Sequence, residues 1–119
     1  MRDFKKLSVW EKAHQLTLNI YQSTDQFPND ERYELTSQMR RSASSIPSNI
    51  AEGCGRISQP QFARFLNIAF GSASELEYQI ILSQDLGFIT SNKSKELNNN
   101  VTEIKRILFS LLKKVKTDS

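Results

Sequence analysis

The apolar positions of the chain recur with the spacing of α-helices along nearly its whole length. In four segments they lie three or four residues apart, which places them on one side of a helix with 3.6 residues per turn. The expected helices cover about residues 9–25, 30–54, 59–85 and 92–116. Their core stripes are Val9, Ala13, Leu16 and Ile20; Leu35, Met39, Ala43, Ile46, Ile50 and Cys54; Phe62, Leu66, Ala69, Ala73, Leu76 and Ile80; and Leu97, Val101, Ile104, Leu108, Leu112 and Val115.

Residues typical of helix ends mark several boundaries. Ser8 and Glu11 form the S-x-x-E pattern of a capping box, and Ser58 precedes a proline at the start of the third segment. Gly87 follows the third segment, where glycine commonly ends a helix. Because short connections join the four segments, we expect an all-α, antiparallel up-down-up-down four-helix bundle that forms one domain over residues 1–119.

Pro47 stands inside the second segment, yet the helical phase of the apolar positions continues through it. A proline there removes the amide that would bond the Ala43 carbonyl, at a cost of roughly 3 kcal/mol. Since the phase does not reset, we expect one helix kinked at Pro47. The nearby hydroxyls of Ser44, Ser45 and Ser48 are candidates for satisfying the freed backbone groups.

Apolar residues outside the core stripes predict contacts between subunits. The first segment carries a second apolar facet, which lies too far around the helix from its core stripe for one buried face to include both. The third segment is apolar around nearly its whole circumference, which is typical of a helix buried on several sides. The candidate interface residues are Trp10, Leu18, Tyr21, Phe65 and Ile68.

A polar stripe runs along the second segment beside its core positions. Three interpretations remain open: a solvated face with i,i+4 pairs such as Glu52 with Arg56, a polar network between subunits, or a groove for a ligand or nucleic acid. The stripe consists of Gln38, Arg41, Ser45, Asn49, Glu52 and Arg56.

Glu77 falls by helical phase among apolar residues of the third segment. A charged side chain in such a place is costly unless it is paired. We therefore expect Glu77, or nearby Glu75, to meet a basic side chain such as Arg40 or Arg41. A catalytic role is a weak alternative, because no nucleophile, metal cluster or glycine-rich phosphate loop accompanies these carboxylates.

Composition narrows the classes of function. With one cysteine, Cys54, and one histidine, His14, the chain has neither an internal disulfide nor the ligands for a Cys/His zinc site. We expect no enzyme activity, no metal and no cofactor. No apolar run approaches the roughly 18 residues of a membrane span, and no signal core follows the N-terminus, so we expect a cytoplasmic protein with no membrane contact.

A basic facet on the fourth segment interleaves cations with the aromatic Phe109. Proteins that bind single strands without sequence preference combine charge neutralisation with stacking in this way. The alternative is a purely structural role, in which lysines in a last helical turn offset the helix dipole. Together with arginines of the second segment, the candidate nucleic-acid contacts are Arg40, Arg41, Arg56, Lys105, Arg106, Lys113 and Lys116.

Several motifs in order resemble one protein family. They read L-S-V-W, F-P, E-x-x-x-L-T-S-Q-M-R-R-S-A-S-S-I-P-S-N-I-A-E-G, F-x-x-F-L-x-x-A-x-G-S-A-S-E-L-E and L-G-F-I. This order resembles the four-helix-bundle family named for proteins encoded in the intervening sequences of bacterial 23S ribosomal RNA genes. The matching positions include Asn49, Glu52, Gly53, Gly71, Ser72, Glu75 and Glu77.

The resemblance implies a homopentameric ring and a link to an accessory protein of diversity-generating retroelements that is thought to bind nucleic acid through a basic surface. It implies no particular reaction. The favoured hypothesis is therefore a non-enzymatic, homo-oligomeric bundle that binds RNA or another single-stranded nucleic acid. The alternative is a structural assembly or adaptor that uses its surplus apolar facets to hold protein partners.

Overall fold

Four long α-helices make up most of the computed structural model, which describes residues 2–118, with side chains described as far as residue 115. No strand occurs within the described residues, so the expectation of an all-α fold with four helices is confirmed. The α-helices are α1 (Ser8–Thr24), α2 (Ser37–Cys54), α3 (Gln59–Asp85) and α4 (Ser91–Asp118). Short helical turns are η1 (Phe4–Lys6), η2 (Asn29–Glu31) and η3 (Arg32–Thr36).

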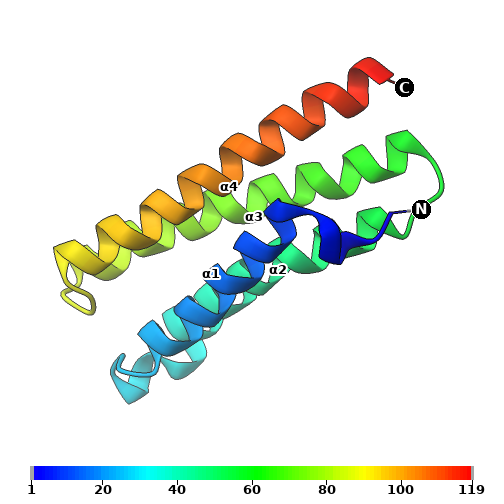
Figure 1. The fold of residues 1–119 in the computed structure, drawn as a ribbon. Helices are drawn as coiled ribbons and strands as arrows, with labels where there is room; N and C mark the ends of the chain where they lie inside the picture. The colour runs from blue at the N-terminus through cyan, green and yellow to red at the C-terminus, as the bar shows by residue number, and fades with distance from the viewer. Residues whose placement is uncertain (1, 119) are drawn as a thin grey trace.

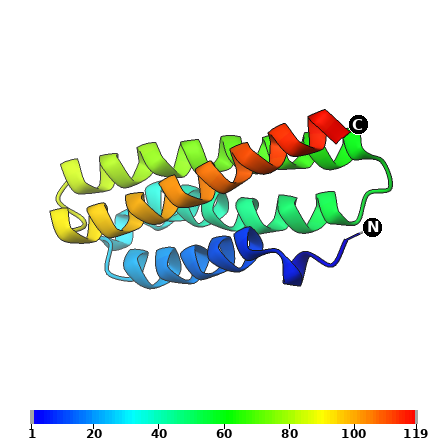
Figure 2. The same ribbon diagram turned by 45° about the horizontal axis from the view of Figure 1, so that its top comes forward.

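The helices lie lengthwise in a body of 45 × 23 × 20 Å, and the chain reverses direction from each helix to the next (Figures 1 and 2). Helix α3 packs extensively against α2 and α4, whereas α1 packs against α2 and less against α4. The end of α2, the start of α3 and the end of α4 share one end of the bundle (Figure 1). The connection between α1 and α2 lies at the opposite end.

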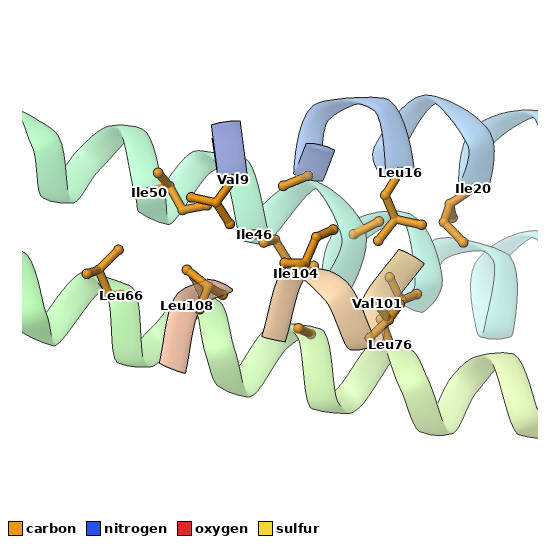
Figure 3. Close-up of a cluster of buried hydrophobic side chains, with 14 of the residues drawn as sticks. Val9, Leu16, Ile20, Ile46, Ile50, Leu66, Leu76, Val101, Ile104 and Leu108 are labelled. Carbon is orange, nitrogen blue, oxygen red and sulfur yellow. The ribbon is translucent and has the colours of Figure 1, made fainter. Parts of the chain in front are cut away.

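The core consists of the predicted stripes. Every residue of the four stripes is buried, and none exposes more than 7% of its surface. Figure 3 shows side chains from all four helices meeting in this core, among them Leu16, Ile46, Leu76 and Ile104. Burying a side chain of this size contributes about 1.5–3 kcal/mol, so the stripes supply the main driving force for folding.

Helix α2 continues through Pro47, which is itself buried. The Ala43 carbonyl accepts a hydrogen bond from Thr17 Oγ1 of α1 at 3.1 Å. The expectation that neighbouring serines satisfy this carbonyl is therefore wrong, because the donor comes from the helix packed alongside. A kink at Pro47 stays a prediction.

The start of α2 differs from the prediction. The helix begins at Ser37 instead of near residue 30, because the helical path is interrupted at Glu34 (φ −109°, ψ −106°). The turns η2 and η3 fill the interval, and neither begins with a side-chain cap. The chain thus makes an irregular corner between Pro28 and Ser37 instead of an early first turn of α2.

Two of the three predicted helix ends have the expected geometry. Ser58 Oγ accepts from the Gln61 amide at 3.3 Å, which caps α3. Gly87 has φ +80°, and the amides of Gly87 and Phe88 donate to carbonyls in the last turn of α3, as in a Schellman motif. The capping box at Ser8 is wrong, because the preceding turn η1 leaves Leu7 in the cap position without a side-chain hydrogen bond.

Candidate nucleic-acid interface

Positive charge is concentrated in the C-terminal half of α4. Residues 104–118 contain five cationic side chains and one anionic side chain, a formal net charge of +4. The whole chain has +3, so the rest of the chain is close to neutral, at −1. Any attraction of this protein for a polyanion therefore comes mainly from this half of one helix.

The cations of α4 differ in how far they are committed to the fold. Lys105 Nζ lies 3.1 Å from Glu77 Oε1 and 5.2 Å from the Phe70 ring centre, and its side chain is only 24% exposed. Phe109 is 55% exposed, and Lys113 Nζ lies 5.6 Å from its ring centre. The Arg106 side chain is exposed and makes no hydrogen bond or ion pair within the described part of the chain. The side chain of Lys116 lies outside the described residues.

The pairing of Glu77 with Lys105 corrects the expected partners. Neither Arg40 nor Arg41 reaches Glu77, because these arginines lie on α2 and Lys105 comes from α4, the other neighbour of α3. Glu75 accepts instead from the Ser42 hydroxyl at 2.7 Å. Glu77 is half-buried, and its partner is basic as expected.

Arg40 joins α1 to α2. Its guanidinium donates to Thr24 Oγ1 at 2.9 Å, to the Tyr21 carbonyl at 3.1 Å and to Asp25 Oδ1 at 3.0 Å. It also lies over the Tyr21 ring, 4.6 Å from its centre. These contacts hold Arg40 in place, whereas within the described residues the exposed Arg41 side chain donates only to Ser37 Oγ of its own helix, at 3.1 Å.

Arg56 lies beyond the C-terminus of α2, at the other end of that helix from Arg40 and Arg41. It forms the expected i,i+4 pair with Glu52 at 2.8 Å and stacks over the Phe65 ring at 4.9 Å. Its Nε atom is buried without a hydrogen-bond partner. The predicted basic residues therefore form three separate groups: the C-terminal half of α4, the start of α2 and the connection after α2.

A hollow with a volume of ≈ 380 Å³ lies at the corner between α1 and α2. Besides Arg40 and Arg41 it is lined by Arg32 and Tyr33, two residues absent from the sequence-based candidates. Asp25 is the single carboxylate in its lining. A signal was present in the sequence, since Tyr33 is a large aromatic residue outside every predicted core stripe.

The polar stripe of α2 is linked to α3 within one chain. The hydroxyls of Ser45 and Ser72 are 2.8 Å apart, and Asn49 Nδ2 donates to the Ser45 carbonyl at 2.8 Å. With the bond from Ser42 to Glu75, three of the family-motif residues (Asn49, Ser72 and Glu75) belong to this network. None of the three open interpretations included such an interhelical network. An adjoining groove of ≈ 450 Å³ includes Gln79, whose buried Oε1 has no hydrogen-bond partner.

The two motif glycines differ in their surroundings. A Cβ at Gly53 would lie 3.0 Å from Phe65 Cβ and 3.1 Å from Phe62 Cδ1, so glycine allows α2 and α3 to approach closely. A Cβ at Gly71 would meet no side chain and no neighbouring helix within 4 Å in the described part of the chain. Packing within one chain therefore explains Gly53 but not Gly71.

The candidate interface residues are covered to different degrees. Trp10 packs against the core and stacks on the His14 ring, with 5.1 Å between ring centres. Tyr21 and Phe65 each carry an arginine over one ring face. Leu18, Tyr21 and Ile68 are 46%, 45% and 41% exposed, so these three leave the most surface open for a contact. Their role in an interface stays a prediction.

A further hollow, of ≈ 540 Å³, lies between α1 and α4. Both of its lysines are paired, Lys12 with Glu103 at 3.2 Å and Lys93 with Glu96 at 2.7 Å. The hydrogen bond from Lys93, with a second from Asn19, holds the pKa of Glu96 below its ordinary value. This hollow therefore offers no uncommitted cation to a ligand.

The described residues contain no group of three His, Cys, Asp or Glu side chains placed to hold a metal ion. Burial raises the pKa of the Cys54 thiol, which keeps it protonated at neutral pH. No helix in residues 2–118 combines the length and apolar character needed to cross a membrane.

Comparison with known proteins connects this fold with one family. The family model for the 23S rRNA-intervening sequence protein matches residues 5–110. A similar crystal structure is that of a protein with unknown function from the S23 ribosomal protein family of Bacteroides thetaiotaomicron VPI-5482. It is 31% identical to this chain with a TM-score of 0.82, and the similarity covers 88% of this chain and 95% of that one. No curated protein matches the chain.

Proposed function

The chain belongs to the 23S rRNA-intervening sequence protein family, and we propose that it is a non-enzymatic, homo-oligomeric protein that binds nucleic acid, with a preference for RNA. The observation that carries this proposal is the net charge of +4 on residues 104–118, against +3 for the whole chain. Cations that neutralise phosphates release condensed counterions, which supplies most of the affinity of a protein that binds nucleic acid without sequence specificity.

Arg106, Phe109 and Lys113 are exposed and lie at i, i+3 and i+7 on one face of α4. Arg106 is not paired within the described residues, and Phe109 exposes more than half of its surface. An exposed aromatic ring flanked by cations suits an unpaired base, because every base has a face that stacks. This arrangement favours single-stranded regions of RNA over a regular duplex.

Binding to a labelled single-stranded RNA, followed by fluorescence anisotropy at rising salt, tests the proposal. Arg106→Gln and Lys113→Gln should each weaken binding and reduce the salt slope by roughly 0.7, the value for one phosphate contact on a single strand. Lys95→Gln is the matched control, because Lys95 is an exposed lysine in the nearly neutral N-terminal half of α4. No binding by the wild-type protein at about 50 mM salt would refute the proposal.

Gly71 supports self-association. Glycine in a helix interior costs up to about 1 kcal/mol relative to alanine, and no contact among the described residues requires it at this position. A second copy that approaches this face of α3 closely would require it. We take the homopentamer implied by the family resemblance as the assembly, in which the basic surface is repeated on every subunit.

Light scattering on Gly71→Ala tests this part of the proposal. The added methyl group should lower the measured mass of the assembly, because it would separate two closely packed helices. If Gly71 faces solvent and not another subunit, the mass should stay unchanged and the free energy of unfolding should rise by about 0.5–1 kcal/mol, because alanine favours the helix more than glycine does.

A protein adaptor without nucleic-acid binding is the second candidate function. It is favoured by the apolar residues that α3 exposes, Ile68, Tyr78 and Ile81. Exposed apolar patches often mark protein interaction sites. A wild-type protein that assembles in light scattering but binds no RNA at about 50 mM salt would support this candidate over the first.

A further inference from the structure

We propose that the hollow at the corner between α1 and α2 binds one nucleotide unit of a single strand, with the base stacked on Tyr33 and the phosphate held by Arg32 and Arg41. This inference rests on the proposed function and names a second contact point, separate from the basic surface of α4. The hollow is formed by the end of α1, the turns η2 and η3, and the first turns of α2.

The charge of the lining favours a phosphate. Three arginines, Arg32, Arg40 and Arg41, face one carboxylate, that of Asp25. Arg40 and Asp25 neutralise one another across 3.0 Å. The remaining two guanidiniums are exposed, and planar guanidinium groups match the geometry of phosphate oxygens.

The arginines of the hollow have distinct roles. Arg40 is held by three hydrogen bonds and by the Tyr21 ring, so it is an immobile part of the lining. Within the described residues the Arg32 side chain makes no hydrogen bond or ion pair, and the Arg41 side chain bonds only to Ser37 Oγ. Arg32 and Arg41 can therefore turn towards a ligand without breaking a contact between helices.

Tyr33 provides the stacking surface. It is 85% exposed, so packing within the fold does not explain an aromatic residue here. The interruption at Glu34 takes this part of the chain off the path of α2 and places Tyr33 at the edge of the hollow. Stacking on an exposed aromatic ring is how proteins hold bases that are free of a partner strand.

The size of the hollow suits one nucleotide. Its volume of ≈ 380 Å³ lies near the lower end of the roughly 300–1,000 Å³ of small-ligand sites. A base inside a duplex cannot leave its stack to enter without unpairing, so the hollow should select single-stranded segments. A free mononucleotide presents the same base and phosphate as a nucleotide within a strand, and the experiment below distinguishes these two ligands.

The test measures anisotropy of a labelled, unstructured RNA of about ten nucleotides on the full chain. Tyr33→Ala should weaken binding about tenfold, and Tyr33→Phe, which retains the stacking face, should restore most of the affinity. Arg32→Gln should weaken binding and reduce the salt slope by roughly 0.7. Ile57→Ala is the control, because Ile57 is also an exposed large apolar residue but lies after α2, outside the hollow, and it should leave affinity within about twofold.

The outcomes separate this inference from the proposed function. Wild-type affinity in both Tyr33→Ala and Arg32→Gln, with loss in Arg106→Gln, would overturn the corner site and leave the surface of α4 in place. Loss of assembly mass in Tyr33→Ala would show instead that the corner contacts another subunit. Tyr33 resonances that respond to AMP in an NMR titration, but not to the oligonucleotide, would overturn binding of a strand. No wild-type RNA binding would overturn both proposals.

Discussion

The hydrogen bond between Thr17 and the Ala43 carbonyl should be a main reason why α2 tolerates Pro47. Pro47 has no amide hydrogen, so the carbonyl four residues earlier lacks its intrahelical donor. Thr17 Oγ1 lies 2.8 Å from the Ala13 carbonyl and 3.1 Å from the Ala43 carbonyl. The Ala13 carbonyl already accepts the Thr17 amide within α1, so Ala43 is the acceptor that depends on this hydroxyl.

Thr17→Val replaces the hydroxyl by a methyl group of similar size, so little packing changes. The mutation leaves a buried carbonyl unsatisfied, which costs about 1–3 kcal/mol. At this chain length each kcal/mol lowers Tm by roughly 3–6 °C. The free energy of unfolding from urea titration, at a fixed protein concentration because assembly adds to stability, gives the loss directly.

A double-mutant cycle with Pro47→Ala makes the explanation specific. Alanine restores an amide at position 47, which can bond the Ala43 carbonyl within α2. Thr17→Val should then cost about 1 kcal/mol less than it does beside Pro47. Thr36→Val is the control, because Thr36 is buried but its hydroxyl makes no hydrogen bond within the described residues. Equal costs in the two backgrounds would refute the reasoning.

Three further predictions concern α2, α3 and their contacts. Gly53→Ala should lower the free energy of unfolding by about 1–2 kcal/mol in urea titration, because the cost of crowding the new methyl group against Phe65 exceeds the gain in helix propensity. An unchanged urea midpoint would contradict this close packing. Glu77→Gln should lower the stability measured by thermal unfolding by about 0.5–1 kcal/mol, since it breaks a half-buried ion pair with Lys105. Adding Lys105→Met to Glu77→Gln should then lower the stability little further. Additive losses would show that the two side chains are not coupled. Burial raises the pKa of the Cys54 thiol in the folded protein. The stability that this thiol contributes is therefore full below its ordinary pKa and is lost as the pH rises through the raised value. Urea midpoints should fall more steeply above pH 9 in the wild type than in Cys54→Ala, and parallel curves would exclude this effect.

The helices and the core could be predicted from the amino-acid sequence alone. The four stripes of apolar residues were sufficient because helical periodicity is a local property, and a residue's face follows from its position in the repeat. Ser58 and Gly87 were readable for the same reason, since a cap bonds to backbone within a few residues. The corner before α2 was not readable, because acidic residues after Pro28 resemble a helix start whether or not the helix begins there.

The pairing of polar groups between helices could be seen only in the folded protein. Thr17 with Ala43, Glu77 with Lys105 and Ser42 with Glu75 each join different helices, and such pairs depend on how far one helix slides and rotates against its neighbour. Packing across the whole interface sets that register, and no single helix encodes it. For the same reason the predicted basic residues proved to lie in three places, and Arg32 and Tyr33 emerged beside Arg41 only when the corner was folded.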